Sequence, residues 1–294
     1  MIAIHQLTKT YKGNVQALKG VDLDIPAAGM FGLLGVNGAG KTTLMRIIAG
    51  LINPTSGTVS VFGNDLASAK GKQAARSMLG YLPQELGLYP NLNAREFLDY
   101  IAILKGITRA VERRAQIEEL IEKVNLSDAA HRPIKSYSGG MKRRVGVAQA
   151  LLGRPKLVIV DEPTTGLDPE ERIRLRNLLA DVARDCAVIL STHIVEDISQ
   201  SCNLLAVING GRALFLGSPQ DLIGRARGHT WTIKTSGDRP NHGLTVVSTL
   251  QLQDGVQYRA LGAPEPAYQA TPTEPSLEDG YIWLVSESRI KQAA

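Results

Sequence analysis

The chain has 294 residues, of which 44% are hydrophobic and 21% charged, a composition typical of a globular protein with one large domain or two. Because no apolar run approaches the roughly 18 residues that span a bilayer, no signal peptide opens the sequence and only two cysteines occur, we expect a cytosolic protein without transmembrane segments or a disulfide framework. The net charge of +5 is diffuse, with no basic tail and no interleaved aromatic platform, so no nucleic-acid partner is expected.

The first part of the chain predicts strands. Residues 2–7 and 18–25 alternate apolar and polar side chains, as half-buried strands do. Residues 30–34 form a short apolar run of strand length that leads directly into a glycine-rich segment.

That segment, residues 35–43 with the sequence GVNGAGKTT, fits the phosphate-cradling pattern G-x-x-x-x-G-K-[ST]. Glycines let the backbone turn tightly and direct successive N–H groups at one anion. Lys41 can reach the β and γ phosphates of a nucleotide, and the Thr42 hydroxyl can ligate Mg²⁺. The flanks agree, because an apolar strand precedes the loop and residues 43–49 have helical spacing up to Gly50. A nucleotide site is therefore favoured over an ordinary glycine-rich turn.

The middle of the chain predicts further strands and then a helical insertion. The strands cover residues 58–62 and 79–82, and the helices cover residues 93–105, 110–124 and 137–152. Asn93 can cap the first of these helices, and Gln84 follows the second strand at once.

Two acids end a predicted buried strand. Residues 157–160 are all apolar, as in parallel strands covered on both faces, and Asp161 and Glu162 follow at the end where open α/β sheets bind ligands. We expect Asp161 to hold Mg²⁺ through water and Glu162 to orient or deprotonate an attacking water. The alternative is a pair of solvated acids where the strand meets a loop.

A second anion site is indicated by Ser138, Gly139 and Gly140. They place a hydroxyl and two exposed N–H groups at the start of a helix. The alternative is a plain helix cap, which is less favoured because the strand that ends in two acids follows about twenty residues later. The basic stretch of residues 142–144 lies beside this motif.

The last third of the chain predicts mixed structure. Helices are expected at about residues 170–184, 194–202 and 219–224. One strand is expected at residues 187–190 and two strands within residues 204–216. From residue 228 onward, alternating stretches and prolines indicate strands and loops, and residues 226–294 are interpreted as a small α+β module.

The motifs GVNGAGKTT, YLPQ, YSGGM, LVIVDEP, GLD and STH, in this order, resemble those of the nucleotide-binding subunit of an ABC transporter over residues 1 to about 224. The signature departs from the frequent family form, with Tyr137 in place of Leu and Met141 in place of Gln, and this variant resembles bacterial drug and lipid exporter ATPases. The segment PSLEDGY at residues 275–281 resembles the C-terminal segment of the same subgroup.

The resemblance implies an α/β fold of the P-loop NTPase, ABC ATPase type, with a mixed sheet core, an antiparallel β subdomain and a helical subdomain. This domain is expected at residues 1–225, with the helical insertion at about 86–155, and the C-terminal α+β module at 226–294.

The resemblance also implies residue roles. Tyr11 would stack on adenine, Gln84 would contact Mg²⁺ and sense a transmembrane partner, and His193 would contact the γ-phosphate. Taken alone, Tyr11 is as readily a core tyrosine, Gln84 a solvated glutamine, and Asp168 a helix cap rather than a residue of a dimer seam. The implied ATP-binding residues are Tyr11, Gly35, Asn37, Gly38, Ala39, Gly40, Lys41, Thr42, Thr43, Ser138, Gly139, Gly140 and Asp168. The implied metal ligands are Thr42, Gln84 and Asp161, and the implied catalytic residues are Glu162, His193, Lys41 and Gln84.

The function implied is an ATP-hydrolysing subunit that powers a membrane transporter, expected to be an exporter, by ATP-driven dimer closure. ATP and Mg²⁺ are the expected cofactors. Separate transmembrane permease subunits are expected as partners, together with a second copy of the chain or a paralogous ATPase, at the cytoplasmic face of the membrane. The alternatives are a soluble ABC-type ATPase that acts on DNA or ribosomes, which long coiled-coil or zinc insertions would mark, and a P-loop kinase or nucleotide switch, which would lack the signature.

Overall fold

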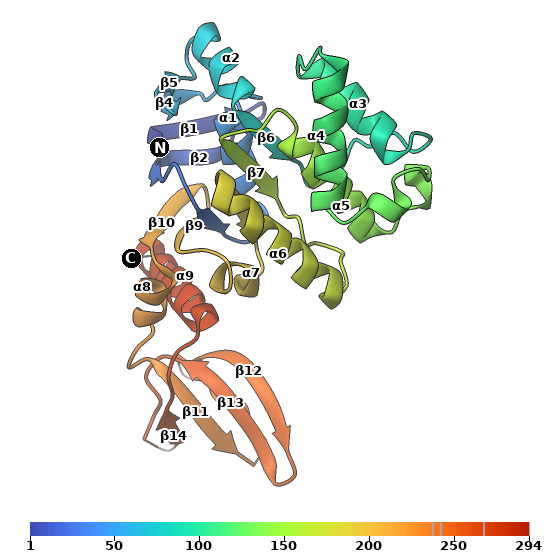
Figure 1. Cartoon of the computed structure of the whole chain (residues 1–294). Coiled ribbons are helices and arrows are strands. Elements are labelled where there is room, and N and C mark those ends of the chain that lie inside the picture. Colours follow the sequence, from blue (N-terminus) through green and yellow to red (C-terminus); the bar gives the residue numbers. More distant parts are fainter. Residues whose placement is uncertain (237, 242, 267, 294) are drawn as a thin grey trace. The chain divides into compact units, whose positions relative to one another are not determined.

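The computed structural model describes residues 1–236, 238–241, 243–266 and 268–293, with side chains up to residue 290. It divides into two compact units, Met1–Ala213 and Leu214–Ala294, which are described separately below (Figure 1). The domain boundary expected after residue 225 stays a prediction. Among the described residues, we find no helix with the length and apolar character needed to traverse a bilayer.

A parallel sheet forms the centre of unit 1. Its strands lie side by side in the order β9 (Leu204–Asn209), β3 (Met30–Leu34), β8 (Ala187–Thr192), β7 (Leu157–Asp161) and β6 (Leu79–Leu82). Every residue of β3, β7 and β8 is buried, which confirms the prediction that residues 157–160 form a strand covered on both faces. Because the strands are parallel, the loops that follow β3, β8, β7 and β6 meet at one edge of the sheet.

An antiparallel sheet covers part of this core. It contains β2 (Val15–Ile25), β1 (Ile2–Tyr11), β4 (Ser56–Val61) and β5 (Asn64–Asp65) in that order. The alternation predicted for the first strands is confirmed, since Ile2, Ile4 and Leu7 are fully buried and pack with the apolar face of α1 (Lys41–Ile48). The helix α2 (Ala69–Ser77) was not predicted, because its sequence is polar.

Helices make up the insertion of unit 1, as predicted. They are α3 (Ala94–Leu104), α4 (Ala110–Lys123) and α5 (Gly139–Leu151), with short 3₁₀ turns at Ser127–Ala129 and Ile134–Ser136. Asn93 caps α3 in a reciprocal capping box with Glu96, which stabilises the predicted start of this helix.

The remaining helices of unit 1 are α6 (Pro169–Asp185) and α7 (Val195–Ser199). The prediction for the second was wrong in length, because it placed helix over residues 194–202. The N–H groups of Ser201 and Cys202 both bond to the carbonyl of Ile198, so the chain tightens and leaves the helix.

Unit 2 is an α+β module. The strand β10 (Arg212–Gly217) crosses the division between the units, and α8 (Pro219–Gly224) follows it. Unit 2 then forms an antiparallel sheet in the order β12 (Thr245–Leu252), β13 (Gly255–Leu261), β11 (Thr230–Thr235) and β14 (Gln269–Pro272). The helix α9 (Leu277–Ala293) packs on α8. Its buried Asp279 forms an ion pair with Arg259 of β13 at 2.6 Å.

Candidate functional site

The glycine-rich loop lies between the end of β3 and the start of α1. An added Cβ at Gly35 would lie 2.3 Å from the carbonyl oxygen of Ile208, and one at Gly40 would lie 2.6 Å from that of Ala17. Gly40 also has φ +107°, a region that side chains rarely allow. The sequence therefore needs glycine at both positions, and the loop delivers the unpaired N–H groups at the start of α1 to its concave side.

Lys41 is held inside this loop. Its side chain is 5% exposed, and Nζ donates hydrogen bonds to the carbonyl oxygens of Gly35 at 2.6 Å and Val36 at 3.2 Å. The same ammonium lies 3.2 Å from Oε1 of Glu162. A compact positive charge thus faces the concave side of the loop, where a phosphate would bind.

Glu162 follows β7 and contacts a second nitrogen group. Its Oε2 lies 2.6 Å from Nδ1 of His193, which follows β8, and accepts a hydrogen bond from the Thr165 hydroxyl at 3.3 Å. Glu162 is 4% exposed and has φ +48°, an uncommon conformation for a residue with a side chain. The parallel sheet therefore brings together three predicted residues that lie far apart in the sequence, Lys41, Glu162 and His193.

A cavity of about 340 Å³ contains the residues predicted to hold a metal. Thr42, Gln84 and Asp161 line it together with Arg46, Tyr81, Pro83 and Glu85. Asp161 is 1% exposed, and neither of its oxygens has a hydrogen bond of good geometry with the described residues. Burial raises the pKa of Asp161, and the nearby hydroxyls of Thr42 and Ser191 oppose this rise. A buried carboxylate with free lone pairs, next to a hydroxyl and an amide, is a donor set that fits Mg²⁺.

The predicted metal ligands include a single carboxylate, that of Asp161. Within the described ranges, no group of three or more His, Cys, Asp or Glu side chains is placed to hold a metal ion. Hard divalent cations at phosphate sites use one or two protein ligands and take the others from phosphate and water, so this observation agrees with a site formed on nucleotide binding.

Two further residues lie near Asp161 and were not predicted as site residues. Arg143 of α5 donates a hydrogen bond to the carbonyl of Pro83 at 3.3 Å, and its burial lowers the pKa of its guanidinium while the charge of Asp161 raises it. Burial and the charge of Asp161 both raise the pKa of Tyr81. The sequence signal for Arg143 is the basic stretch of residues 142–144 beside the signature, and the signal for Tyr81 is its place in the YLPQ motif.

Tyr11 lies at the other side of the loop. A cavity of about 380 Å³ is lined by Tyr11, by residues 36–43 of the loop, by Gln84 and Glu162, and by side chains of β2. The Tyr11 hydroxyl lies 3.3 Å from that of Thr43, and 40% of the residue is exposed. Tyr11 is therefore not a core residue, and its ring, with the Lys9 ammonium 5.3 Å from the ring centroid, lies at the rim of this cavity.

The signature residues lie apart from these cavities. Ser138 is the N-cap of α5, where its hydroxyl accepts a hydrogen bond from the Met141 N–H at 3.2 Å. An added Cβ at Gly140 would lie 2.2 Å from the carboxylate of Glu171, so a larger residue there would displace this side chain. Asp168 caps α6, with Oδ1 accepting from the Glu171 N–H at 2.9 Å. The helix-cap interpretation of Asp168 thus holds within one chain, and neither Ser138 nor Asp168 lines the cavity at the phosphate loop.

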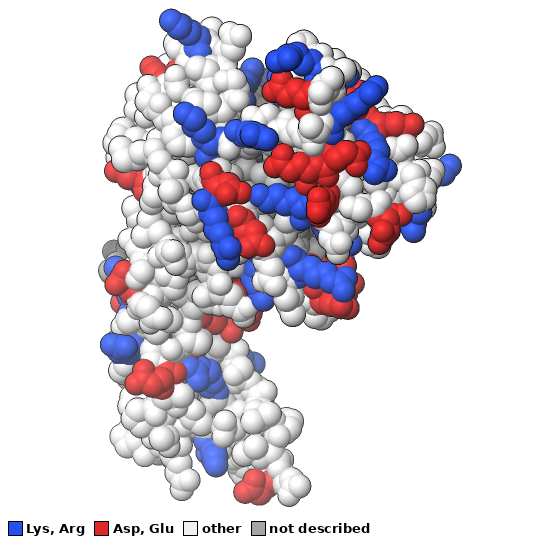
Figure 2. All heavy atoms as spheres, in the orientation of Figure 1, with Lys and Arg blue, Asp and Glu red and all other residues white. Residues whose placement is uncertain are grey.

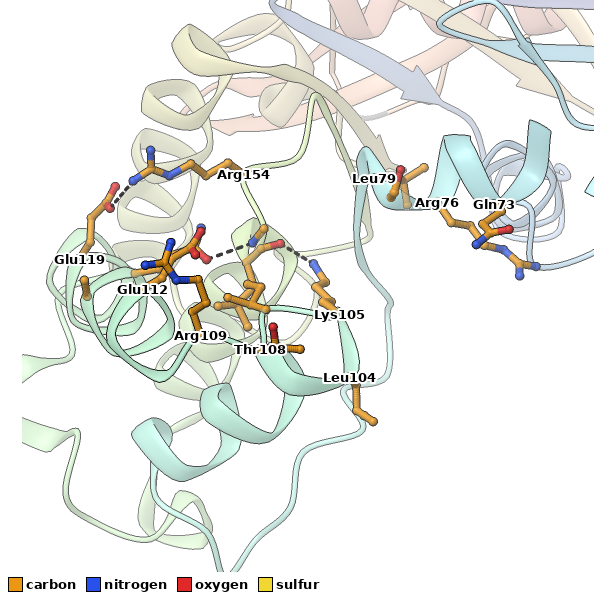
Figure 3. A pocket seen from close by; sticks show the side chains of 17 residues that line it. Gln73, Arg76, Leu79, Leu104, Lys105, Thr108, Arg109, Glu112, Glu119 and Arg154 are labelled. Atoms are coloured by element: carbon orange, nitrogen blue, oxygen red, sulfur yellow. Dashed lines mark hydrogen bonds and ion pairs between the residues drawn. The ribbon is translucent and has the colours of Figure 1, made fainter. Parts of the chain in front are cut away.

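A larger cavity of about 1030 Å³ contains none of the predicted nucleotide residues (Figure 3). It is lined by residues of α2, by the loop between α3 and α4, and by the end of α5. Lys105 donates to the carbonyl of Leu152 at 2.8 Å, and Arg154 pairs with Glu119 at 3.2 Å (Figure 3). Two of its basic side chains are thus already engaged, and the size of a cavity alone does not identify the nucleotide site.

Comparisons with known proteins agree with this geometry. The family model described as ABC transporter matches residues 18–165. An uncharacterized ABC transporter ATP-binding protein of Bacillus subtilis, YxlF, is 37% identical over 233 residues, which cover 79% of this chain and 76% of that protein. The human phospholipid-transporting ATPase ABCA7 is 40% identical over 253 residues, which cover 84% of this chain but only 12% of that much longer protein.

The chain also resembles solved structures of ATP-binding cassettes and of ABC transporter subunits. The dimeric ATP-binding cassette MJ0796, in a post-hydrolysis state bound to ADP and Pi, has a TM-score of 0.67 and 27% identity and covers 74% of this chain and 98% of its own. The cbiO1 protein of Clostridium perfringens, part of the ABC transporter complex cbiONQ, has a TM-score of 0.69 and 26% identity and covers 76% of this chain and 90% of its own.

Proposed function

The chain belongs to the ABC transporter family as an ATP-binding protein with ATPase activity, and from this premise we propose that it drives a membrane transporter whose spanning segments lie in separate subunits. The observation that carries the proposal is the contact of Glu162 with both Lys41 and His193 beside the phosphate loop. Lys41 neutralises the β and γ phosphates, Glu162 orients or deprotonates the attacking water, and His193 contacts the γ-phosphate.

Thr42, Asp161 and Gln84 are the residues that would hold Mg²⁺. When bound, the ion neutralises phosphate charge and keeps the terminal phosphates aligned for attack. The protein's part is to keep Asp161 buried and available, which its free lone pairs support.

We propose that two chains share each site. Ser138 is exposed and Gly140 is buried, and both lie at the start of α5, outside the cavity at the phosphate loop of their own chain. We therefore place them against the γ-phosphate that a partner chain would hold. The dimeric cassette MJ0796 supports this arrangement, since it resembles the chain over most of unit 1. ATP binding would close the dimer, and hydrolysis would reopen it.

A mixture of two inactive variants tests the shared site. Lys41→Ala removes the charge at the phosphates, and Ser138→Arg blocks the signature, so each homodimer should be inactive. In a mixed dimer, the intact loop of one chain meets the intact signature of the other, and one site of two is whole. If half of the dimers are mixed, about a quarter of the normal sites should return.

If one whole site cannot turn over alone, the mixture regains no activity even when the sites are shared. The oligomeric state of a variant is therefore measured as well. Glu162→Gln should bind ATP without turning it over and should dimerise when ATP is added. A Glu162→Gln chain that stays monomeric in saturating ATP, together with no rescue in a verified mixture, would overturn the shared site.

The membrane partner is proposed to dock on the helical insertion. Exposed apolar side chains gather there, with Leu104 66% and Val111 84% exposed, and the rings of Tyr89 and Tyr100 lie 5.5 Å apart. Gln84 precedes this surface directly, so its contact at the nucleotide can report closure to the partner. Apolar side chains exposed over adjacent elements are typical of a protein interface.

This docking proposal has its own test. Tyr100→Glu should reduce co-purification of the chain with a membrane-embedded permease and leave the ATP affinity unchanged. Leu51→Asp, at an apolar side chain that is 53% exposed elsewhere in unit 1, is the matched control. Equal losses for both variants would refute a specific docking surface.

We further propose that the transporter is an exporter at the cytoplasmic face of the membrane. The signature variant and the phospholipid transport named for the human relative support this direction. An action on DNA or ribosomes has less support. Proteins that bind nucleic acids usually present a stripe or patch of basic side chains. On the face drawn in Figure 2, basic and acidic side chains are instead interspersed over the helical part of unit 1. Identification of the co-purifying permease and its cargo decides between these functions.

A further inference from the structure

The segments that carry Glu162 and His193 are joined by a further acid, Asp197 of α7. Asp197 is 4% exposed, and its Oδ2 accepts hydrogen bonds from the Thr164 hydroxyl at 2.7 Å and the Thr192 hydroxyl at 3.4 Å. Both threonines are buried as well. One carboxylate therefore links the loop after β7 to the end of β8.

At the end of β8, the hydrogen bonds of Asp197 and Thr192 hold the backbone on both sides of His193. The Thr192 hydroxyl also accepts a hydrogen bond from the N–H of Ile194 at 2.9 Å. Because a hydroxyl has one proton, it accepts from Ile194 and donates to Asp197. The residues before and after His193 are thus held by the same hydroxyl, which fixes the backbone that carries the imidazole.

After β7, the hydrogen bond from Thr164 to Asp197 holds the turn that begins at Glu162, a residue with strained backbone. Glu162 has φ +48°, which for a residue with a side chain persists only where the surroundings enforce it. Two backbone hydrogen bonds close the turn, from Thr165 to Glu162 at 3.4 Å and from Leu167 to Thr164 at 3.2 Å. The bond from Thr164 to Asp197, at 2.7 Å, is shorter than either and ties this turn to α7.

The chemistry of Asp197 is unusual for a packing residue. In the part of the chain that the structure describes, Asp197 forms no ion pair, and the side-chain donors to its carboxylate are neutral hydroxyls. Burying a carboxylate without a cation is unfavourable, and an apolar side chain would fill the same space without that penalty. A carboxylate is, however, a strong acceptor that can hold two hydroxyls through one oxygen.

We propose that Asp197 is a positioning residue for ATP hydrolysis, which holds Glu162 and His193 in their 2.6 Å contact through Thr164 and Thr192. The proposal rests on the catalytic roles proposed above for Glu162 and His193. Asp197 itself does not reach the cavity at the phosphate loop, so it acts through the two threonines.

The first test compares three substitutions in the full chain. Asp197→Ala removes the acceptor and should lower kcat by about 10-fold to 100-fold, because small displacements of reacting groups have effects of this size, while the Kd for ATP stays within about twofold. Asp197→Asn keeps an acceptor oxygen of the same reach and should recover most of the lost kcat. Glu196→Ala, at the exposed neighbouring acid, is the matched control and should leave kcat unchanged.

The second readout is spectroscopic and separates positioning from general stability. The ring ¹⁵N signals of His193, assigned by their loss in His193→Ala, should shift in Glu162→Gln because the 2.6 Å contact changes. Asp197→Ala should move these signals in the same direction, while Asp197→Asn and Glu196→Ala should leave them in place. A kcat within twofold of the wild-type value in Asp197→Ala, or a lower kcat with unmoved His193 signals, would overturn the proposal.

Two controls keep the outcome decisive. If Asp197→Ala does not fold, Thr164→Val and Thr192→Val each remove one hydroxyl donor without changing the side-chain shape, and each should lower kcat and shift the His193 signals. Full turnover in Glu162→Gln would refute the proposed catalytic role of Glu162. A loss in Glu162→Gln with unaffected Thr164→Val and Thr192→Val would refute only the role of Asp197.

Discussion

Replacing Tyr11 by alanine removes the ring at the rim of the cavity beside the phosphate loop. If the ring stacks on adenine, its loss should weaken ATP binding by about 1–3 kcal/mol, the range measured for base–aromatic stacking. This corresponds to a Kd that is roughly 5-fold to 150-fold higher. Because 40% of Tyr11 is exposed, the lost burial should destabilise the fold by only about 1–2 kcal/mol, so the chain should stay folded.

The assay is calorimetric titration of the folded variant with ATP, ADP and tripolyphosphate. A base-stacking residue should weaken ATP and ADP equally and leave tripolyphosphate, which has no base, unchanged. Tyr11→Phe should be close to neutral, since it loses only the hydroxyl contact of 3.3 Å to Thr43. Tyr100→Ala is the matched control, because that tyrosine is 43% exposed and does not line the cavity. An unchanged affinity for ATP in folded Tyr11→Ala would refute the stacking role.

Further substitutions test the rest of the structure. Glu162→Gln should keep ATP affinity and lower turnover by about 100-fold or more, as expected for a lost general base, and near-normal phosphate release would exclude that role. Gly40→Ala should abolish ATP binding and lower the Tm, because φ is +107° and its Cβ would lie 2.6 Å from the carbonyl of Ala17; a variant that binds normally would contradict the strain argument. Asp279→Asn should destabilise the chain by about 3 kcal/mol at pH 7, the lower end for breaking a buried ion pair, because Arg259 is 26% exposed. Burial raises the pKa of Asp279, but hydrogen bonds from Arg259 and from the start of α9 outweigh this effect and lower the pKa. The greater stability of the wild type should therefore be present above about pH 4 and be lost as the pH falls through the lowered pKa of Asp279. Unfolding of both proteins at several pH values measures this difference.

Much of the fold could be predicted because its sequence patterns are local. The all-apolar strands at β3 and β7 and the alternating strands at β1 and β2 reflect burial on two faces or on one, and burial acts directly on residue type. Asn93 carries its own helix-start signal in its side chain. The phosphate loop is also recognisable from the sequence, because backbone contacts require glycine at Gly35 and Gly40 and a positive φ favours it at Gly38.

Other elements could not be predicted because their sequences carry mixed signals. The helix α2 is polar with only Gly71 and Ala75 buried, so it shows almost no apolar stripe. The helix α9 begins with LEDG, and Gly280 interrupts its helical pattern; the glycine is needed because a Cβ there would lie 2.2 Å from the carbonyl of Leu222. Such close approaches are set by tertiary packing, and a single sequence does not reveal them.

The candidate site, like the fold, could be predicted from the sequence only in part. Parallel strands β3, β8 and β7 are neighbours, so any polar residue placed just after them comes to one edge of the sheet, and this rule brings Lys41, Glu162 and His193 together without knowledge of their side-chain contacts. The rule does not say which buried group fixes their orientation. Asp197 lies within a short helix, next to the exposed Glu196, and nothing in its local sequence distinguishes an acid that points into the core from one that points to solvent. Strand position therefore determines which groups can react, whereas the buried hydrogen bonds of α7 determine whether they face one another, and only the structure supplies the second condition.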